Sequence, residues 1–177
     1  MNDLFGMSVA FAGDVNGDML DDVIIGAPGY STQTGAAYIY FGGTFMDSTA
    51  DLIVYGENSS DYFGSSVSAT GDINGDGYND LVVGAHLYPN NTFVGRVFIF
   101  HSSSSGIASM NASAANTILT AEAVSSFGIN TTVVDTNGDG FGDVIVGGHT
   151  YNSNQGRTHV FQSSGSSGIA TANASTA

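Results

Sequence analysis

The hydrophobic residues of this chain gather in short runs that recur three times along its length. One kind of run follows an aspartate and is continuously apolar, as an inner strand buried on both faces would be. A second kind begins at a glycine and is rich in aromatic and aliphatic residues, which also predicts a strand. The continuously apolar runs occupy residues 22–26, 80–84 and 143–147, and the glycine-led runs occupy residues 35–41, 95–100 and 156–161.

Each repeat offers two further strand candidates around these runs. The first leads from a Phe-Gly pair toward an acidic loop, as at 65–69, and the last is apolar, at 52–55 and 117–120. No window of the sequence shows helical periodicity. Four antiparallel strands that recur in this way predict the blades of a β-propeller, which is an all-β fold. The expected blades are residues 1–58, 59–123 and 124–177.

The third repeat stops before its fourth strand. Ser-Gly-Ile-Ala at 105–108 recurs at 167–170, and this alignment places Ala177 two residues before the expected outer strand. We therefore expect the last blade to lack its outer strand. Three blades are fewer than the four to eight that close a propeller, which predicts further blades from a longer chain or from a homo-oligomer. The Ser-rich stretches 102–116 and 163–177 are expected to be long, mobile loops between third and fourth strands.

The composition agrees with a β-rich fold and restricts the partners. The 177 residues include 25 Gly and no Cys, and 42% are hydrophobic, so a core can form without disulfides or thiolate metal sites. Sixteen acidic residues against two basic ones give a net charge of −14. This charge argues against a nucleic-acid partner, because phosphate binding requires a basic patch. No run approaches the roughly 18 apolar residues of a membrane span, so membrane insertion is not expected.

Three acidic loops with the same spacing precede the continuously apolar runs. Calcium takes six to eight oxygen ligands, and alternate positions of a tightly turning loop point inward. Positions 1, 3, 5 and 9 supply side-chain oxygens, and position 7 would supply a backbone carbonyl. The sequence therefore predicts up to three Ca²⁺ sites, one in each repeat. Their ligands are Asp14, Asn16, Asp18, Leu20 and Asp22; Asp72, Asn74, Asp76, Tyr78 and Asp80; and Asp135, Asn137, Asp139, Phe141 and Asp143.

The alternative interpretation of each loop is an ordinary Asn-Gly-Asp turn without an ion. Nine of the 16 acidic residues occupy ligand positions in these loops, and three carboxylates in one small turn repel one another without a cation. The loops are not EF-hands, because position 12 is Ile25, Val83 or Val146 within a strand instead of a glutamate. Structural ions are therefore expected in preference to a switch.

The first loop departs from the other two. It carries Met19 where the others carry Gly77 and Gly140. If that position requires a positive φ, a methionine is strained there. The site at Asp14–Asp22 is therefore expected to be the weakest of the three.

These motifs together resemble a known family. The Phe-Gly pairs at 5–6, 63–64 and 127–128, the Asp-x-Asn-x-Asp-x-x-x-Asp loops and Gly-Ala-Pro at 26–28 are similar to the FG-GAP repeats of integrin α-subunit propellers and their prokaryotic relatives. The second and third repeats have Gly-Ala-His and Gly-Gly-His instead of Gly-Ala-Pro. The third repeat is also one residue shorter before its loop and lacks the glycine that precedes Asp14 and Asp72.

The resemblance implies a seven-bladed propeller with calcium in loops between the first two strands of certain blades. It also implies adhesion and ligand recognition outside the cell or at the cell surface, on the face away from the calcium loops. A minority of the family is attached to enzymes such as phospholipases.

Histidines and glycosylation sequons add candidate chemistry. His86 and His149 occupy equivalent turn positions, and His159 alternates within a strand, which favours structural roles over a metal or catalytic centre. No Gly-x-Ser-x-Gly elbow is present, and an enzyme is not expected. Asn-x-Ser/Thr sequons are compatible with a secreted glycoprotein; they stand at Asn58, Asn90, Asn111, Asn130 and Asn173.

Three functions are compatible with these observations. The first is a non-enzymatic, calcium-binding propeller module for extracellular adhesion, recognition of a protein or glycan ligand, or structural assembly. The second is an accessory or carbohydrate-binding propeller of a secreted hydrolase. The third is an excised or designed propeller fragment that self-assembles.

Overall fold

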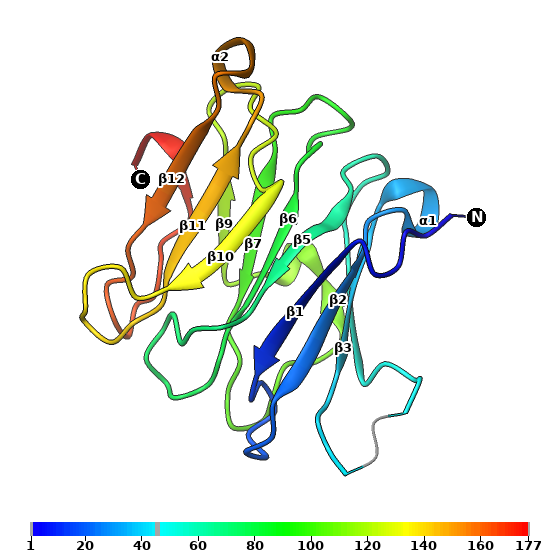
Figure 1. The fold of residues 1–177 in the computed structure, drawn as a ribbon, viewed down its shortest axis with the longest axis vertical. Helices are drawn as coiled ribbons and strands as arrows, with labels where there is room; N and C mark the ends of the chain where they lie inside the picture. Colours follow the sequence, from blue (N-terminus) through cyan, green and yellow to red (C-terminus); the bar gives the residue numbers. More distant parts are fainter. Residues whose placement is uncertain (1, 45–46, 177) are drawn as a thin grey trace.

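The computed structural model describes residues 2–44 and 47–176, which form three mainly antiparallel sheets side by side (Figure 1). The strands of the first two repeats are β1 (Ser8–Gly13), β2 (Asp22–Ala27), β3 (Ala36–Tyr40), β4 (Leu52–Tyr55), β5 (Phe63–Ser68), β6 (Leu81–Ala85), β7 (Arg96–Phe100), β8 (Met110–Asn111) and β9 (Thr117–Thr120). The third repeat contributes β10 (Asn130–Val134), β11 (Asp143–Gly148), β12 (Arg157–Phe161) and β13 (Ala172–Asn173). The all-β fold expected from the sequence is confirmed.

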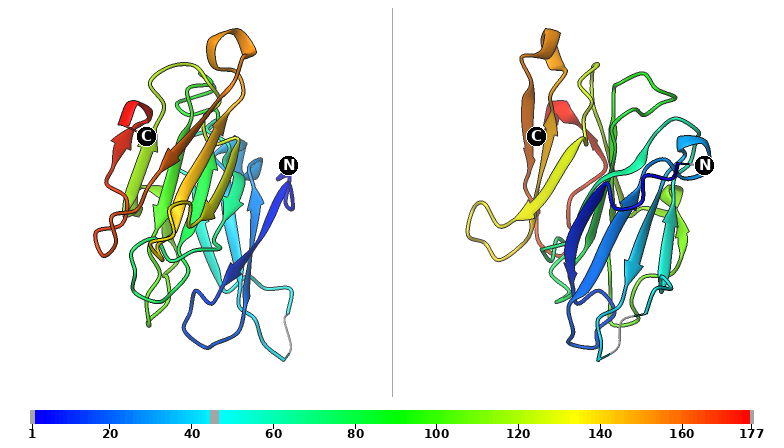
Figure 2. Two further views of the ribbon diagram at one scale, coloured as in Figure 1. Left: turned by 60° about the vertical axis from the view of Figure 1, so that its left-hand side comes forward. Right: turned by 45° about the vertical axis from the view of Figure 1, so that its right-hand side comes forward.

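Each sheet is built mainly from one repeat and is called a blade here. Blade one has the strand order β1-β2-β3-β4, blade two has β5-β6-β7-β9, and blade three has β10-β11-β12. Within these series every neighbouring pair is antiparallel. Among the described residues, blade three has no outer strand of its own, as the sequence predicts. The two turned views in Figure 2 show the three blades as an open row.

The Ser-rich stretches are not free loops, which corrects the expectation from the sequence. Each stretch reaches back to the preceding blade and adds a fifth, parallel strand beside its outer strand. Thus β8 pairs with β4, and β13 pairs with β9. Ile107 and Ile169 from these stretches are buried. A two-residue strand carries no period that sequence analysis can detect, but here it covers backbone groups that would otherwise form an exposed edge.

Blade three pairs its first two strands more regularly than blade one does. In blade one the register shifts between Phe11 and Gly13, so Ala12 is an extra residue in the ladder, as in a β-bulge. In blade three the register from Asn130 to Val134 runs without a shift. The shorter third repeat therefore lacks the bulge and keeps the strand pair.

The hydrophobic core lies between the blades as two layers. One layer lies between blade one and blade two, and includes Ile24, Ile39 and Phe98. The second joins blades two and three, and includes Val82 and Val133. The continuously apolar inner strands β2 and β6 supply residues to these layers because they lie inside their sheets.

Glycines let the backbones of neighbouring blades meet. A Cβ added to Gly26 would lie 2.0 Å from the carbonyl oxygen of Gly64, and one added to Gly84 would lie 2.0 Å from that of Gly128. No side chain fits in such a contact. The hydroxyl of Ser66 donates to the same Gly128 carbonyl at 2.8 Å, so the approaching carbonyl has a hydrogen-bond partner. The glycine of the Phe-Gly pair is thus seated against the preceding blade.

The segments α1 and α2 are single left-handed turns. In α1 (Tyr30–Gln33), Ser31 has a φ of 45°, and in α2 (Tyr151–Asn154), Asn152 has a φ of 47°. Right-handed helix is not present in them, in line with the missing helical period of the sequence. None of the helices in the described part of the chain is long and apolar enough to cross a membrane.

The glycine contact between blades gives a direct test of the packing. Gly84→Ala places a methyl group against the backbone of blade three, and we expect it to lower the free energy of unfolding by about 2–3 kcal/mol. Gly43→Ala is the matched control, because nothing lies within 4 Å of its added Cβ, and a change within about 0.5 kcal/mol is expected. Chemical denaturation of both variants measures the difference. Equal stabilities would contradict the close approach.

Candidate metal centres

The three acidic loops lie at the same end of their blades. They join β1 to β2, β5 to β6 and β10 to β11, and all three project from the lower ends of the sheets in Figure 1. Each loop begins directly after, or a few residues after, the first strand of its blade and ends on the aspartate that opens or precedes the second. The structure therefore places the three predicted ligand sets in equivalent positions.

The aspartate at position 1 organises each loop through the backbone. In blade two, Asp72 Oδ1 accepts hydrogen bonds from the N–H groups of Gly75 at 2.6 Å and Asp76 at 3.2 Å. Its Oδ2 accepts one from the N–H of Gly77 at 2.7 Å. The same three bonds recur at Asp14 and at Asp135. The turn is thus wrapped around one carboxylate.

Positions 3 and 5 are linked to each other in all three loops. In blade two, the carboxamide Nδ2 of Asn74 donates to Asp76 Oδ2 at 3.1 Å, and Asn74 Oδ1 accepts the N–H of Asp76 at 3.0 Å. Asp76 Oδ1 accepts the N–H of Tyr78, the residue at position 7, at 3.0 Å. Equivalent bonds occur in the loops of blades one and three.

The aspartate at position 9 is fully buried and joins three parts of its blade. Asp80 is 0% exposed, and its Oδ2 accepts the N–H of Ile73 in the loop at 2.8 Å. Its Oδ1 accepts the N–H of Ser102, just after the third strand, at 2.9 Å. Asp22 and Asp143 make the corresponding pairs of bonds. The carboxylate therefore fastens the loop to the second strand and to the exit of the third.

Burial makes the ionised form of this aspartate costly. Desolvation raises the pKa of Asp80 to about 7, and repulsion from Asp76 and Asp72 adds to the rise, although the N–H groups of Ser102 and Ile73 oppose it. Burial likewise raises the pKa of Asp22. In contrast, hydrogen bonds from the loop N–H groups, led by Gly140, lower the pKa of exposed Asp135. Each loop thus combines an exposed carboxylate with a buried one.

The oxygen ligands of the loops fit a hard cation. In the structure, hydrogen bonds from backbone N–H groups to the carboxylates hold the loop conformation. Among the described residues, no three carboxylate or imidazole groups gather closely enough to form a ready-made metal cluster. Each carboxylate oxygen has two lone pairs, so one that accepts an N–H can also bind a cation. The predicted ligand atoms of the loops are all oxygens, which suits calcium.

The residue at position 7 has a role that sequence reasoning missed. The ring of Tyr78 lies 3.1 Å from the place where a Cβ on Gly17 would stand, and the ring of Phe141 lies 2.4 Å from that of Gly75. Each aromatic ring therefore covers the acidic loop of the preceding blade. The sequence signal for this packing was the aromatic residue at position 7 in repeats two and three. Repeat one has Leu20 at this position, and its side chain is 47% exposed.

The sixth position of the loop does require a left-handed backbone. Gly77 and Gly140 have φ values of 93° and 91°, and Met19 has a φ of 69°. The side chain of Met19 is almost fully exposed, so no packing compensates for the strain. The positive φ that the sequence argument assumed at this position is confirmed. Weaker calcium binding in the first loop remains a prediction.

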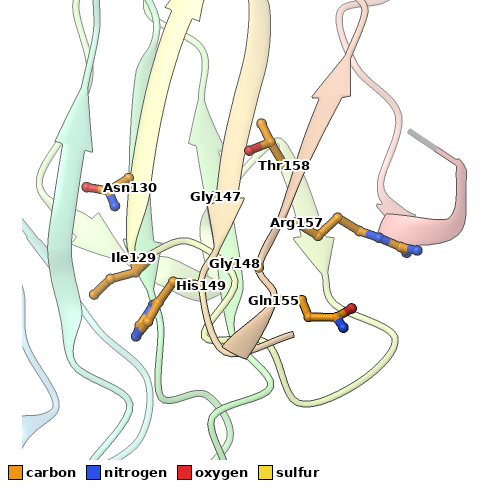
Figure 3. Close-up of a pocket in the computed structure, with 9 residues that line it drawn as sticks. Ile129, Asn130, Gly147, Gly148, His149, Gln155, Arg157 and Thr158 are labelled. Carbon is orange, nitrogen blue, oxygen red and sulfur yellow. The ribbon is translucent and has the colours of Figure 1, made fainter. Parts of the chain in front are cut away.

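Of the two turn histidines, His86 is packed against its neighbours, and His149, labelled in Figure 3, is exposed. The ring of His86 meets that of Tyr62 edge-on with centroids 5.8 Å apart, and its Nδ1 is buried without a hydrogen-bond partner in the described structure. Burial lowers the pKa of His86 to about 4, with a smaller contribution from His149. This environment favours a neutral imidazole.

Replacing the strained methionine should stabilise loop one. Met19→Gly relieves a left-handed conformation that costs about 1 kcal/mol or more, partly offset by the greater freedom of glycine in the unfolded chain. We expect a net gain of about 0.5–1 kcal/mol in chemical denaturation. The reciprocal variant Gly77→Met should lose a similar amount. A loss of stability in Met19→Gly would show that the methionine side chain is itself important.

Protonation of His86 should weaken the fold in acid. The unfolded chain takes up the proton near the ordinary pKa of 6.5, whereas the folded chain takes it up near 4. The stabilising contribution of the neutral His86 ring is therefore complete above about pH 6.5 and falls as the pH drops toward 4. NMR titration of the His86 ring measures the folded pKa directly, and His86→Gln should flatten the pH dependence of unfolding. A ring that titrates at 6.5 would contradict this account.

Comparison with known proteins places these features in one family. The FG-GAP repeat model matches residues 5–40, 63–100 and 127–161. Integrin alpha-5 from Xenopus laevis is 36% identical over 157 residues, which is 83% of this chain and 15% of that protein. Integrin alpha-PS5 from Drosophila melanogaster is 42% identical over 111 residues, or 60% of this chain and 11% of that protein. The chain belongs to the FG-GAP repeat family, and its blades form part of a β-propeller similar to the N-terminal domain of integrin α-subunits.

Proposed function

We propose that this chain is a calcium-stabilised β-propeller module without enzymatic activity. The observation that carries the proposal is the buried aspartate at the end of each acidic loop. Asp22, Asp80 and Asp143 are each 0% exposed, and their described hydrogen-bond donors are uncharged. A carboxylate removed from water without a cation is unfavourable. A calcium ion supplies the missing positive charge.

The proposed ligands are those of the three loops. Positions 1, 5 and 9 would give carboxylate oxygens, position 3 a carboxamide oxygen, and position 7 a backbone carbonyl. The oxygen-only donor set and the acidic charge of the chain support calcium over softer metals. Because position 9 is anchored to two other segments, an ion held there would strengthen the junction of loop and sheet. Loop one, strained at Met19, is proposed as the weakest site.

The setting of the module is proposed from its relatives. The chain spans 15% of the length of the integrin alpha-5 that it matches, so the activity of a whole protein can only be proposed. We infer an extracellular or cell-surface module for adhesion or ligand recognition, with a protein or glycan ligand on the face away from the acidic loops. The proposed repeats are 1–58, 59–123 and 124–177, and further blades are the proposed structural partners, from a longer chain or from a second copy.

Removal of one ligand tests the calcium sites. Asp76→Ala should lower the free energy of unfolding in calcium by about 1–3 kcal/mol, because stabilisation by a bound ion is lost. In the presence of a chelator the same variant should differ little from the wild type. Thermal unfolding in the two conditions measures both values.

Asp21→Ala is the matched control for this experiment, since Asp21 is exposed and adjoins a ligand position without occupying one. It should behave like the wild type in calcium. Equal losses for Asp76→Ala with and without calcium would show that the loop is a turn stabilised by its own hydrogen bonds.

A further inference from the structure

The acidic loops of neighbouring blades, called loops one, two and three after their blades, are in contact through the residue at position 7. The N–H of Tyr78 donates to Asp76 Oδ1 within loop two at 3.0 Å. The ring of Tyr78 lies 3.1 Å from the place where a Cβ on Gly17 of loop one would stand. Phe141 in loop three covers Gly75 of loop two in the same way. The backbone of position 7 thus belongs to one loop, while its ring packs on the loop before it.

The covered glycine stands at position 4 of its loop, where it supports the first proposed ligand. The N–H of Gly17 donates to Asp14 Oδ1 at 2.6 Å, and the N–H of Gly75 donates to Asp72 Oδ1 at 2.6 Å. Both glycines have a positive φ, of 84° and 75°, which is one of the many conformations open to a glycine. A ring packed on this glycine therefore restricts the backbone that orients the carboxylate of position 1.

Position 8 adds a second contact between the same loops. The N–H of Gly142 in loop three donates to the backbone carbonyl of Asp72 in loop two at 2.7 Å. In loop two, the carboxamide of Asn79 fills the space beside Gly13, which directly precedes loop one. A Cβ added to Gly13 would lie 1.7 Å from Asn79 Nδ2. The loops are thus packed in series, with loop two on loop one and loop three on loop two.

The Ser-rich stretch that follows β7 also covers loop one, and it begins at the buried aspartate of loop two. The N–H of Ser102 donates to Asp80 Oδ1 at 2.9 Å. Four residues later, a Cβ added to Gly106 would lie 3.6 Å from the Cα of Asn16, the residue at position 3 of loop one. Asp80 at position 9 therefore holds the start of a segment that packs against the preceding loop.

We propose that Tyr78 and Phe141 couple the calcium sites of neighbouring blades, so that occupancy of one loop raises the calcium affinity of the loop before it. The inference rests on the calcium sites proposed above and adds that they do not fill independently. The backbone carbonyl of position 7 is a proposed ligand of its own loop, and its ring orders the preceding loop. Because coupling between two binding sites is reciprocal, each loop also gains affinity from the one before it.

Conformational entropy is the physical basis of this coupling. Ordering a flexible loop around an ion costs conformational entropy, and a loop that its neighbour has already ordered loses less of it on binding. Loop one has the most to gain, since the left-handed Met19 makes it the weakest of the proposed sites. The dependence of loop one on loop two is therefore the most sensitive test of the proposal.

NMR titration of the metal-stripped chain with calcium chloride reads each loop separately. Position 4 gives every loop one reporter, which is the amide resonance of Gly17, Gly75 or Gly138. The half-saturating calcium concentration at Gly17 measures the affinity of loop one. Asp76→Ala removes a proposed ligand of loop two only, and it should raise this concentration about five-fold or more.

A double-mutant cycle separates coupling through the ring from simple support of loop one. Tyr78→Ala keeps the backbone carbonyl of position 7 and removes the ring, so it should also raise the half-saturating concentration at Gly17. With Asp76→Ala in the same chain, the combined rise should be much less than the product of the two single rises, because both changes break the same coupling. Tyr78→Phe should keep the wild-type value, since Phe141 makes this contact in blade three without a hydroxyl.

Tyr151→Ala is the matched control for the loss of an aromatic ring. Tyr151 is partly buried, as Tyr78 is, but it lies in α2, at the opposite end of the blades from the acidic loops (Figure 1). The half-saturating concentration at Gly17 should therefore stay at the wild-type value. Circular dichroism at the titration temperature establishes that each variant is folded.

The outcomes separate the coupling from calcium binding itself. If Asp76→Ala leaves the half-saturating concentration at Gly17 unchanged or lowers it, the coupling is overturned. Single effects that multiply in the double variant overturn it as well. In both cases the glycine amides still shift with calcium, so the calcium sites stand. If none of the three glycine amides shifts, the calcium proposal fails, and this inference fails with it.

Discussion

The buried aspartate at the end of each acidic loop is the constraint on which the rest of the blade depends. It holds the loop and the exit of the third strand through two backbone N–H groups, as Asp143 does with Thr136 and Ser163 at 3.0 and 2.9 Å. The hydroxyl of Ser163 then donates to the carbonyl of Ile73 in the loop of the preceding blade at 2.6 Å. One buried charge thus connects two loops and two blades. Its cost in a chain with two basic residues supports the proposal that a cation binds beside it.

The second constraint is the approach of glycine backbones between blades. It requires glycine at both sides of the contact and fixes the distance at which the apolar layers close. The same small set of contacts is repeated from blade to blade, so the structure behaves as a one-dimensional stack in which each unit contacts its neighbours. A stack of this kind has two complementary ends.

Much of this architecture could be predicted from the sequence because it repeats. The outer strands at 52–55 and 117–120 are found at the same residues, and the acidic loops fall between the first two strands of every blade. The positive φ of Met19 followed from its alignment with two glycines. Repetition supplied the information that a single short strand lacks.

What could not be predicted depends on contacts between repeats. The short strands β8 and β13 carry no pattern of their own, and their partners lie in the preceding blade. The packing of Tyr78 on Gly17 is a contact over 61 positions, from 17 to 78. In blade three, the loss of one residue removed a bulge without removing the strand pair. The sequence shows such a deletion but does not show which part of the ladder absorbs it.

The most direct test of the calcium account is isothermal titration of the metal-stripped chain with calcium, which counts the ions bound by each molecule. The account predicts three ions for each chain, with two similar sites and one weaker site. Titration without binding heat, and with no change in the ion content of the dialysed protein, would contradict it and leave the loops as turns held by their own hydrogen bonds.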